Sequence, residues 1–204
     1  MMIFNQDLVK SRKASSIDNI KNSDFYRFLY SDLIQRLEPI DKTYKEGLVL
    51  GFGNYHMFPI NNPYNLNYTE LDQLVLIEKK SLDLVLFPFG FHWLNDVQKF
   101  LFKVKDVLKN DGIFVCNFAG SGSLNHLRKL LFLAEEEHNI SHFPHISPFI
   151  KFEDMTPLMQ QAGFAENIID CETIELEYKN PILFMRALKS FGETTLLQNQ
   201  CISI

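Results

Sequence analysis

A strand–helix–strand unit in the middle of the chain constrains the fold most. Residues 82–87 form an apolar run typical of a buried strand, and the next segment, capped by Asn95 or Asp96, has apolar residues at helical spacing. Residues 109–112 predict a turn, and residues 113–118 predict a second strand. Since two strands joined through a helix lie parallel with a right-handed crossover, this unit predicts an α/β sheet.

The flanking segments continue the alternation of helix and strand. Apolar spacing predicts helices over residues 7–13, 25–37, 124–137 and 154–162, strands over 47–51 and 168–178, and a short strand near 66–68 within the Asn- and Pro-rich loop 54–68. We therefore expect one domain over residues 1–204, built on a doubly wound, mostly parallel sheet. Its parts are N-terminal helices in 1–40, a sheet core in 47–118, a helical insertion in 119–160 and a C-terminal part in 161–204.

Charge and composition exclude several classes of protein. The net charge of −5 and the scattered basic residues argue against general binding to nucleic acid. No apolar stretch is long enough to predict a spanning helix, and the polar N-terminal residues argue against a secretion signal. Cys116, Cys171 and Cys201 have neither metal-ligand nor redox spacing, which predicts free thiols in a reducing cytoplasm.

The first predicted strand ends in a glycine turn. Residues 48–50 run into Gly51 and Gly53, a pattern typical of a parallel strand whose turn lets the backbone approach a ligand. The dinucleotide fingerprint requires a third glycine, and Tyr55 and His56 stand in its place. By itself, such a turn is more often a simple connection than a binding site.

Motifs spread along the chain give a resemblance to a known family. They are Leu82-Asp-Leu-Val85, His92-Trp-Leu-Asn-Asp96, Leu108-Lys-Asn-Asp-Gly-Ile-Phe114, Leu124-Asn-His-Leu-Arg128, His142-Phe-Pro-His-Ile-Ser-Pro-Phe149, Ala162-Gly-Phe164 and Leu183-Phe-Met-Arg-Ala-Leu-Lys189. With these motifs the chain resembles the class I S-adenosylmethionine-dependent methyltransferases, in the branch of the biotin-synthesis enzyme BioC and the related complex I assembly factor. The resemblance implies a Rossmann-like fold and S-adenosylmethionine as cofactor.

The chain departs from the family pattern at several positions. In such methyltransferases a carboxylate in the first strand organises the glycine turn, and an acid ending the second strand holds the ribose; here Val49 takes the place of the first carboxylate. Between Gly53 and Asp83 there is room for about one βαβ unit of roughly 30 residues, where the family has two crossovers. We therefore expect a fold shortened by loss of the second strand–helix unit and of the C-terminal strand, which only residues 201–204 could replace.

The resemblance also implies cofactor-binding residues, namely Gly51, Gly53, Asn54, Glu70, Asp72 and Phe89. Glu70 or Asp72 would lie on the adenine side, at the end of the family's third strand. The alternative for both is a solvated loop carboxylate.

Two groups of residues are candidates for catalysis and substrate binding. His92 and Trp93 resemble the family's His-Trp pair and would border the transferred methyl group, unless they only anchor the loop. His142, His145 and Ser147 form a second group, in which His145 is either a general base or a loop-fixing residue. Arg128 on the preceding helix would bind a carboxylate or phosphate. Two histidines three residues apart do not make a metal site without further ligands, so none is predicted.

Three functions follow from these observations. The chain is a methyltransferase acting on a small-molecule or acyl-carrier substrate such as a malonyl thioester, a non-catalytic binding or assembly protein for a respiratory-complex subunit, or a decayed product that retains only a foldable core. The departures at Val49 and Tyr55 weaken the first, and the intact motifs at 92–96 and 142–149 argue against the third. The sequence thus favours a methyltransferase-like protein with an impaired cofactor site, and leaves catalysis open.

Overall fold

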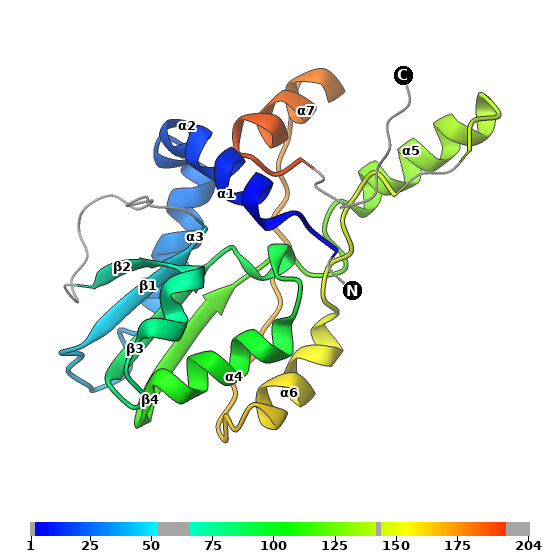
Figure 1. Ribbon diagram of the computed structural model, residues 1–204. Coiled ribbons are helices and arrows are strands. Elements are labelled where there is room, and N and C mark those ends of the chain that lie inside the picture. The colour runs from blue at the N-terminus through cyan, green and yellow to red at the C-terminus, as the bar shows by residue number, and fades with distance from the viewer. Residues whose placement is uncertain (1–2, 53–65, 142–143, 195–204) are drawn as a thin grey trace.

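Four parallel strands form the sheet of the computed structural model, which describes residues 3–52, 66–141 and 144–194 (Figure 1). The strands are β1 (Gly47–Gly51), β2 (Asn67–Glu70), β3 (Leu82–Pro88) and β4 (Leu108–Asn117), and their order in the sheet is β2-β1-β3-β4. All three pairings are parallel. Because β1 lies between β2 and β3, the chain leaves the middle of the sheet in both directions, and this is the doubly wound arrangement predicted from the sequence.

Helices cover both faces of this sheet. They are α1 (Gln6–Ser15), α2 (Ile17–Lys21), α3 (Asp24–Gln35), α4 (Val97–Val107), α5 (Asn125–Glu137), α6 (Phe152–Gln161) and α7 (Pro181–Ser190), with the short 3-10 helices η1 (Leu71–Leu76) and η2 (Phe91–Trp93). Helix α3 contacts β3 and β4 on one face of the sheet. On the other face α4 contacts β4, and α6 in turn contacts α4. Figure 1 shows α5 extending away from the sheet and α7 lying beside α1 and α2.

The side chains of β1 divide between the two core clusters that cover the faces of the sheet. Since successive side chains of a strand point to opposite faces, Leu48 and Leu50 enter the cluster on the α4 side, whereas Val49 enters the cluster on the α3 side with Tyr30 and Leu37. All five residues of β1 are buried, as expected of a central parallel strand.

The central β3–α4–β4 unit confirms the prediction that constrained the fold most. Asp96 caps α4 by accepting from the Lys99 backbone N–H at 2.8 Å. The predicted turn at residues 109–112 falls within the bounds of β4, which begins at Leu108. Leu82 pairs with Leu108 and Leu84 pairs with Ile113, so residues 109–112 form an irregularity in the register between the two paired positions.

The predicted strand at residues 168–178 is wrong, since no strand forms there. A strand exists only through its hydrogen-bonded neighbour, and this segment is not paired with the sheet. Ile168 is almost fully exposed, and Asp170 forms an ion pair with Arg36 of α3 at 2.8 Å. An apolar alternation in sequence therefore did not suffice to form a strand.

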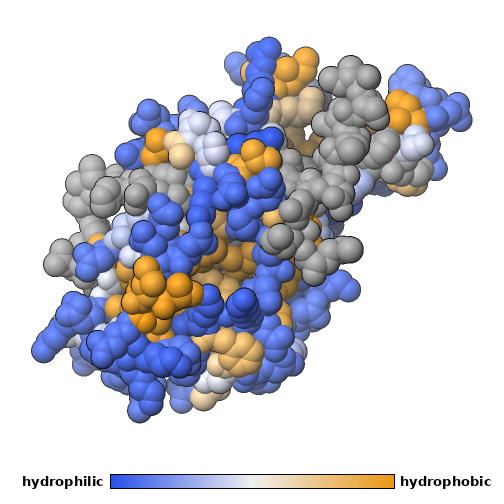
Figure 2. Space-filling model, in the orientation of Figure 1, coloured by the Kyte–Doolittle hydropathy of each residue, from blue (hydrophilic) through white to orange (hydrophobic). Residues whose placement is uncertain are grey.

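The surface in the view of Figure 2 is mostly hydrophilic. An apolar patch lies over η1, where Val75 and Leu76 are exposed. Within the described residues, no helix combines the length and the apolar character needed to cross a membrane.

Asp83 ties the start of β3 to its neighbours, and we expect Asp83→Asn to lower the free energy of unfolding by about 1.5 kcal/mol. Its carboxylate accepts from Lys109 Nζ at 2.8 Å and from the backbone N–H of Glu46 at 3.0 Å. The Lys109 hydrogen bond is the main cause that lowers the pKa of Asp83. A lowered pKa in the folded state means that the contribution is complete above about pH 4 and is lost as the pH falls.

Urea unfolding at neutral and acid pH measures this effect. The difference between wild type and Asp83→Asn should shrink in acid, and Asp41→Asn, which changes an exposed carboxylate, is the matched control. If Asp83→Asn lost the same free energy of unfolding at both pH values, the ionised carboxylate of Asp83 would not be the source of the effect.

Candidate functional site

The carboxyl end of β3 leads directly into the residues predicted to border a substrate. In open parallel sheets ligands bind at this end of the strands. Gly90 is required at the turn because a Cβ there would overlap the ring of Phe87. The turn brings the Phe89 ring edge-on to His92, with 4.8 Å between ring centroids. His92 and Trp93 follow in η2, and both are buried.

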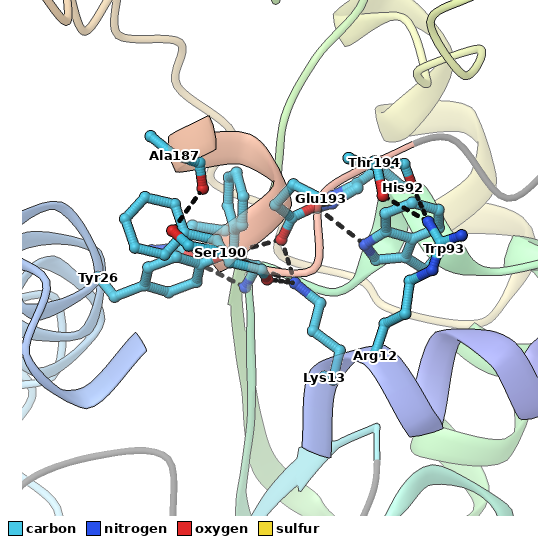
Figure 3. Close-up of polar contacts among 12 residues, drawn as sticks. Arg12, Lys13, Tyr26, His92, Trp93, Ala187, Ser190, Glu193 and Thr194 are labelled. Atoms are coloured by element: carbon cyan, nitrogen blue, oxygen red, sulfur yellow. Dashed lines mark hydrogen bonds and ion pairs between the residues drawn. The ribbon is translucent and has the colours of Figure 1, made fainter. Parts of the chain in front are cut away.

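The carboxylate of Glu193, just after α7, joins these two residues (Figure 3). Its Oε2 lies 2.9 Å from His92 Nε2 and accepts a hydrogen bond from Trp93 Nε1 at 3.1 Å. Its Oε1 accepts from the Tyr26 hydroxyl at 2.6 Å and also contacts Lys13 Nζ. The structure therefore collects residues from α1, α3, η2 and the segment after α7 at one point.

Glu193 is ionised in this setting. Burial alone would raise the pKa of its carboxyl, but the charge of Lys13 and the contacts that Lys13 and His92 make to it outweigh burial and hold the pKa well below its usual range. The sequence analysis missed Glu193 because a single acid after a helix carries no signal. The one available hint was Gly192, which ends α7 with a φ of +67° and turns the chain toward the site.

The predicted cofactor turn is closed on the side of β2. A side chain at Gly51 would overlap the Tyr68 hydroxyl, so Tyr68 fills the space beside this glycine. Val49 is buried among apolar side chains on the same face. Gly53 and Asn54 lie outside the described residues.

Of the two predicted acids, Glu70 ends β2, next to β1, and Asp72 lies in the first turn of η1. Glu70 is paired in register with Gly51, so β2 is the direct neighbour of β1 rather than the farther strand assumed from the sequence. Lys10 of α1 contacts Asp72 and lies 3.9 Å from Glu70. The hydrogen bond to Asp72 is the main cause that raises the pKa of Lys10.

The predicted substrate-side residues lie on α5 and the segment that follows it. Arg128 donates to Asn125 Oδ1 at 2.5 Å within this helix. His145 Nε2 lies 2.6 Å from Glu135 Oε1, and Ser147 is buried. The His145–Glu135 pair ties the following segment back onto α5, which fits the loop-fixing alternative.

His142 lies outside the described residues. Among the residues that are described, no three His, Cys, Asp or Glu side chains are grouped so that they could hold a metal ion.

Comparison with known proteins gives a likeness for part of this chain. A model described as a methyltransferase domain matches residues 61–116, a range that includes β2, η1, β3, α4 and most of β4. A putative methyltransferase of Rickettsia prowazekii is 45% identical over 129 residues, which are 63% of this chain and 57% of that protein. Over these residues the chain is similar to class I methyltransferases. The four-stranded parallel sheet with flanking helices confirms the predicted α/β fold.

Two named groups of proteins are also similar to the chain. The mitochondrial arginine-hydroxylase NDUFAF5 of Mus musculus is 34% identical over 129 residues, covering 63% of this chain and 38% of that protein. The malonyl-[acyl-carrier protein] O-methyltransferase of Nitrosospira multiformis is 30% identical over 123 residues, covering 60% and 38%. The chain is thus a methyltransferase-like protein related to both groups, and its match spans little more than half the length of the Rickettsia relative and less of the others.

Proposed function

We propose that this methyltransferase-like protein has an impaired cofactor site and acts by binding a partner rather than by methyl transfer. The family uses S-adenosylmethionine, so the question is whether the described residues fit that molecule. They do not fit it well at the end of β1.

The observation that carries the proposal is the closure of Gly51 by Tyr68. A glycine turn binds a ligand by letting it approach the backbone closely, and here a side chain of the same protein takes that space. Two further observations support the proposal. Val49 offers no carboxylate to organise the turn, and Lys10 forms an ion pair with Asp72 and lies 3.9 Å from Glu70.

Titration with S-adenosylmethionine and S-adenosylhomocysteine tests the proposal by calorimetry. We expect no saturable heat at millimolar ligand, since Tyr68 takes the space that the methionine part would need beside Gly51. Tyr68→Ala is the informative variant, because it opens the space beside Gly51 and should bind more tightly than wild type. Micromolar binding to the wild type would overturn the proposal.

For the partner, the relatives suggest two classes. We propose a respiratory-complex subunit as the first candidate, from the likeness to NDUFAF5, and an acyl carrier protein as the second, from the malonyl-[acyl-carrier protein] enzyme. A pull-down from native lysate distinguishes them by which class it recovers. The free thiols of Cys116 and Cys171 suit a reducing compartment, and we propose the cytoplasm.

A further inference from the structure

Four hydrogen-bond donors from separate elements converge on the Glu193 carboxylate (Figure 3). They are Lys13 of α1, Tyr26 of α3, and His92 and Trp93 of η2, two for each carboxylate oxygen. We propose that these donors form a binding site for a small aliphatic carboxylate, and that Glu193 occupies it as a tethered competitor. The proposal does not depend on loss of methyl transfer.

The donors are positioned by contacts that do not involve Glu193. Trp93 packs edge-on against Phe4, with 5.4 Å between ring centroids, and its carbonyl accepts from Gln6 Nε2 at 2.8 Å. Tyr26 packs edge-on against Phe89 at 5.8 Å. A site whose donors are fixed beforehand binds a carboxylate without the entropy cost of ordering them.

The donors are also buried at the end of the sheet where ligands bind. Lys13, Tyr26, His92 and Trp93 are between 1% and 5% exposed. Hydrogen bonds to a charged acceptor are stronger away from water. Since the site collects a cation and three neutral or protonatable donors, it recognises a carboxylate rather than a cation or an apolar group.

Glu193 itself belongs to a loosely packed segment. Helix α7 has no buried residue, and Ile182, Leu183 and Met185 on it are exposed. The end of α7 is held by Asn19 Nδ2 donating to the Ser190 carbonyl at 3.1 Å, and Lys13 Nζ also donates to the Phe191 carbonyl at 3.3 Å. Because α7 has few buried contacts of its own, the release of Glu193 is opposed mainly by its bonds to the four donors, and an incoming carboxylate would replace those bonds.

The contact between Arg12 and Thr194 holds the chain just after Glu193, as the contact of Asn19 with Ser190 holds it just before. Arg12 Nη1 donates to the Thr194 hydroxyl and to its carbonyl at 3.4 Å. His92 Nδ1, on the side of the ring away from Glu193, is buried without a hydrogen-bond partner among the described residues.

Butyrate is the probe that tests the proposal, since it repeats the Glu side chain from Cα to the carboxylate. Trp93 is the one tryptophan of the chain, so its fluorescence reports on the site directly. We expect a saturable change with butyrate and none with butyramide, its neutral counterpart. In Glu193→Ala the butyrate concentration that gives half of the fluorescence change should fall by about tenfold or more, because the tethered competitor is gone.

Two more variants separate the site from a general effect of the substitution. Lys13→Met in the Glu193→Ala background should abolish the response to butyrate. Thr194→Val leaves every donor intact and removes the hydroxyl that accepts from Arg12. Its half-saturating butyrate concentration should therefore be several-fold lower than that of the wild type. This variant also keeps the test decisive if Glu193→Ala does not fold.

Hydrogen exchange distinguishes displacement from binding elsewhere. When butyrate takes the site in the wild type, the backbone amides of residues 181–194 should exchange faster, because their anchor has been released. Unchanged or slower exchange at saturating butyrate would overturn the proposal. Equal responses to butyrate and butyramide, or no response in Thr194→Val, would overturn it as well.

Discussion

Replacing Glu193 with alanine should lower the free energy of unfolding by about 3–5 kcal/mol. The substitution leaves Lys13 buried without its carboxylate and removes the acceptor of Tyr26, His92 and Trp93. Glu193→Gln should cost less, since the amide oxygen still accepts while the charge is lost. Urea unfolding followed by circular dichroism measures the free energy of unfolding of the wild type, Glu193→Ala and Glu193→Gln.

The pH dependence of this loss identifies its origin. The pKa of Glu193 is lowered on folding, so its contribution is complete above the ordinary value of 4.5 and is lost as the pH falls below it. The difference between wild type and Glu193→Ala should therefore shrink in acid. Glu175→Ala, at an exposed position, is the matched control and should change stability by less than about 0.5 kcal/mol. A loss of the same small size for Glu193→Ala would contradict the buried ion cluster.

Val49→Asp should lower the free energy of unfolding by about 3 kcal/mol or more. The substitution supplies the carboxylate that the family carries in its first strand, but Val49 is 6% exposed and packs among Tyr30, Leu37 and Leu86. A carboxylate there has no charged partner in that cluster, so it is buried at a cost. We expect no gain in affinity for S-adenosylmethionine.

Val75→Asp is the control for this variant, because Val75 is 55% exposed and its change should leave stability within about 0.5 kcal/mol of wild type. Thermal unfolding and calorimetric titration measure the two effects separately. A stable Val49→Asp protein that binds S-adenosylmethionine would show that this carboxylate alone was missing.

The sheet could be predicted because its signals are local. The apolar run of β3, the Asp96 cap and the amphipathic α4 each specify their element within a few residues. The strand predicted over 168–178 failed for the opposite reason. Its alternation is local, but pairing requires a neighbouring strand that the sequence does not reveal.

The candidate site was predictable only in part for the same reason. His92 and Trp93 follow a recognisable strand, so their place at its end followed from the pattern. Their partner Glu193 lies 101 residues after His92 in the sequence, and nothing local marks it. The place of Glu70 beside Gly51 likewise depended on which strand β2 adjoins.

The sequence by itself determined the parallel α/β architecture, the likeness to class I methyltransferases and the residues at the end of β3, because hydrophobic periodicity, caps and motifs are written in consecutive residues. Only the tertiary structure decided that Tyr68 fills the space beside Gly51 and that Lys10 pairs with Asp72. It alone also placed Glu193 among its four donors. Each of these contacts joins segments far apart in the chain, and their meeting depends on how the helices pack on the sheet rather than on any local preference.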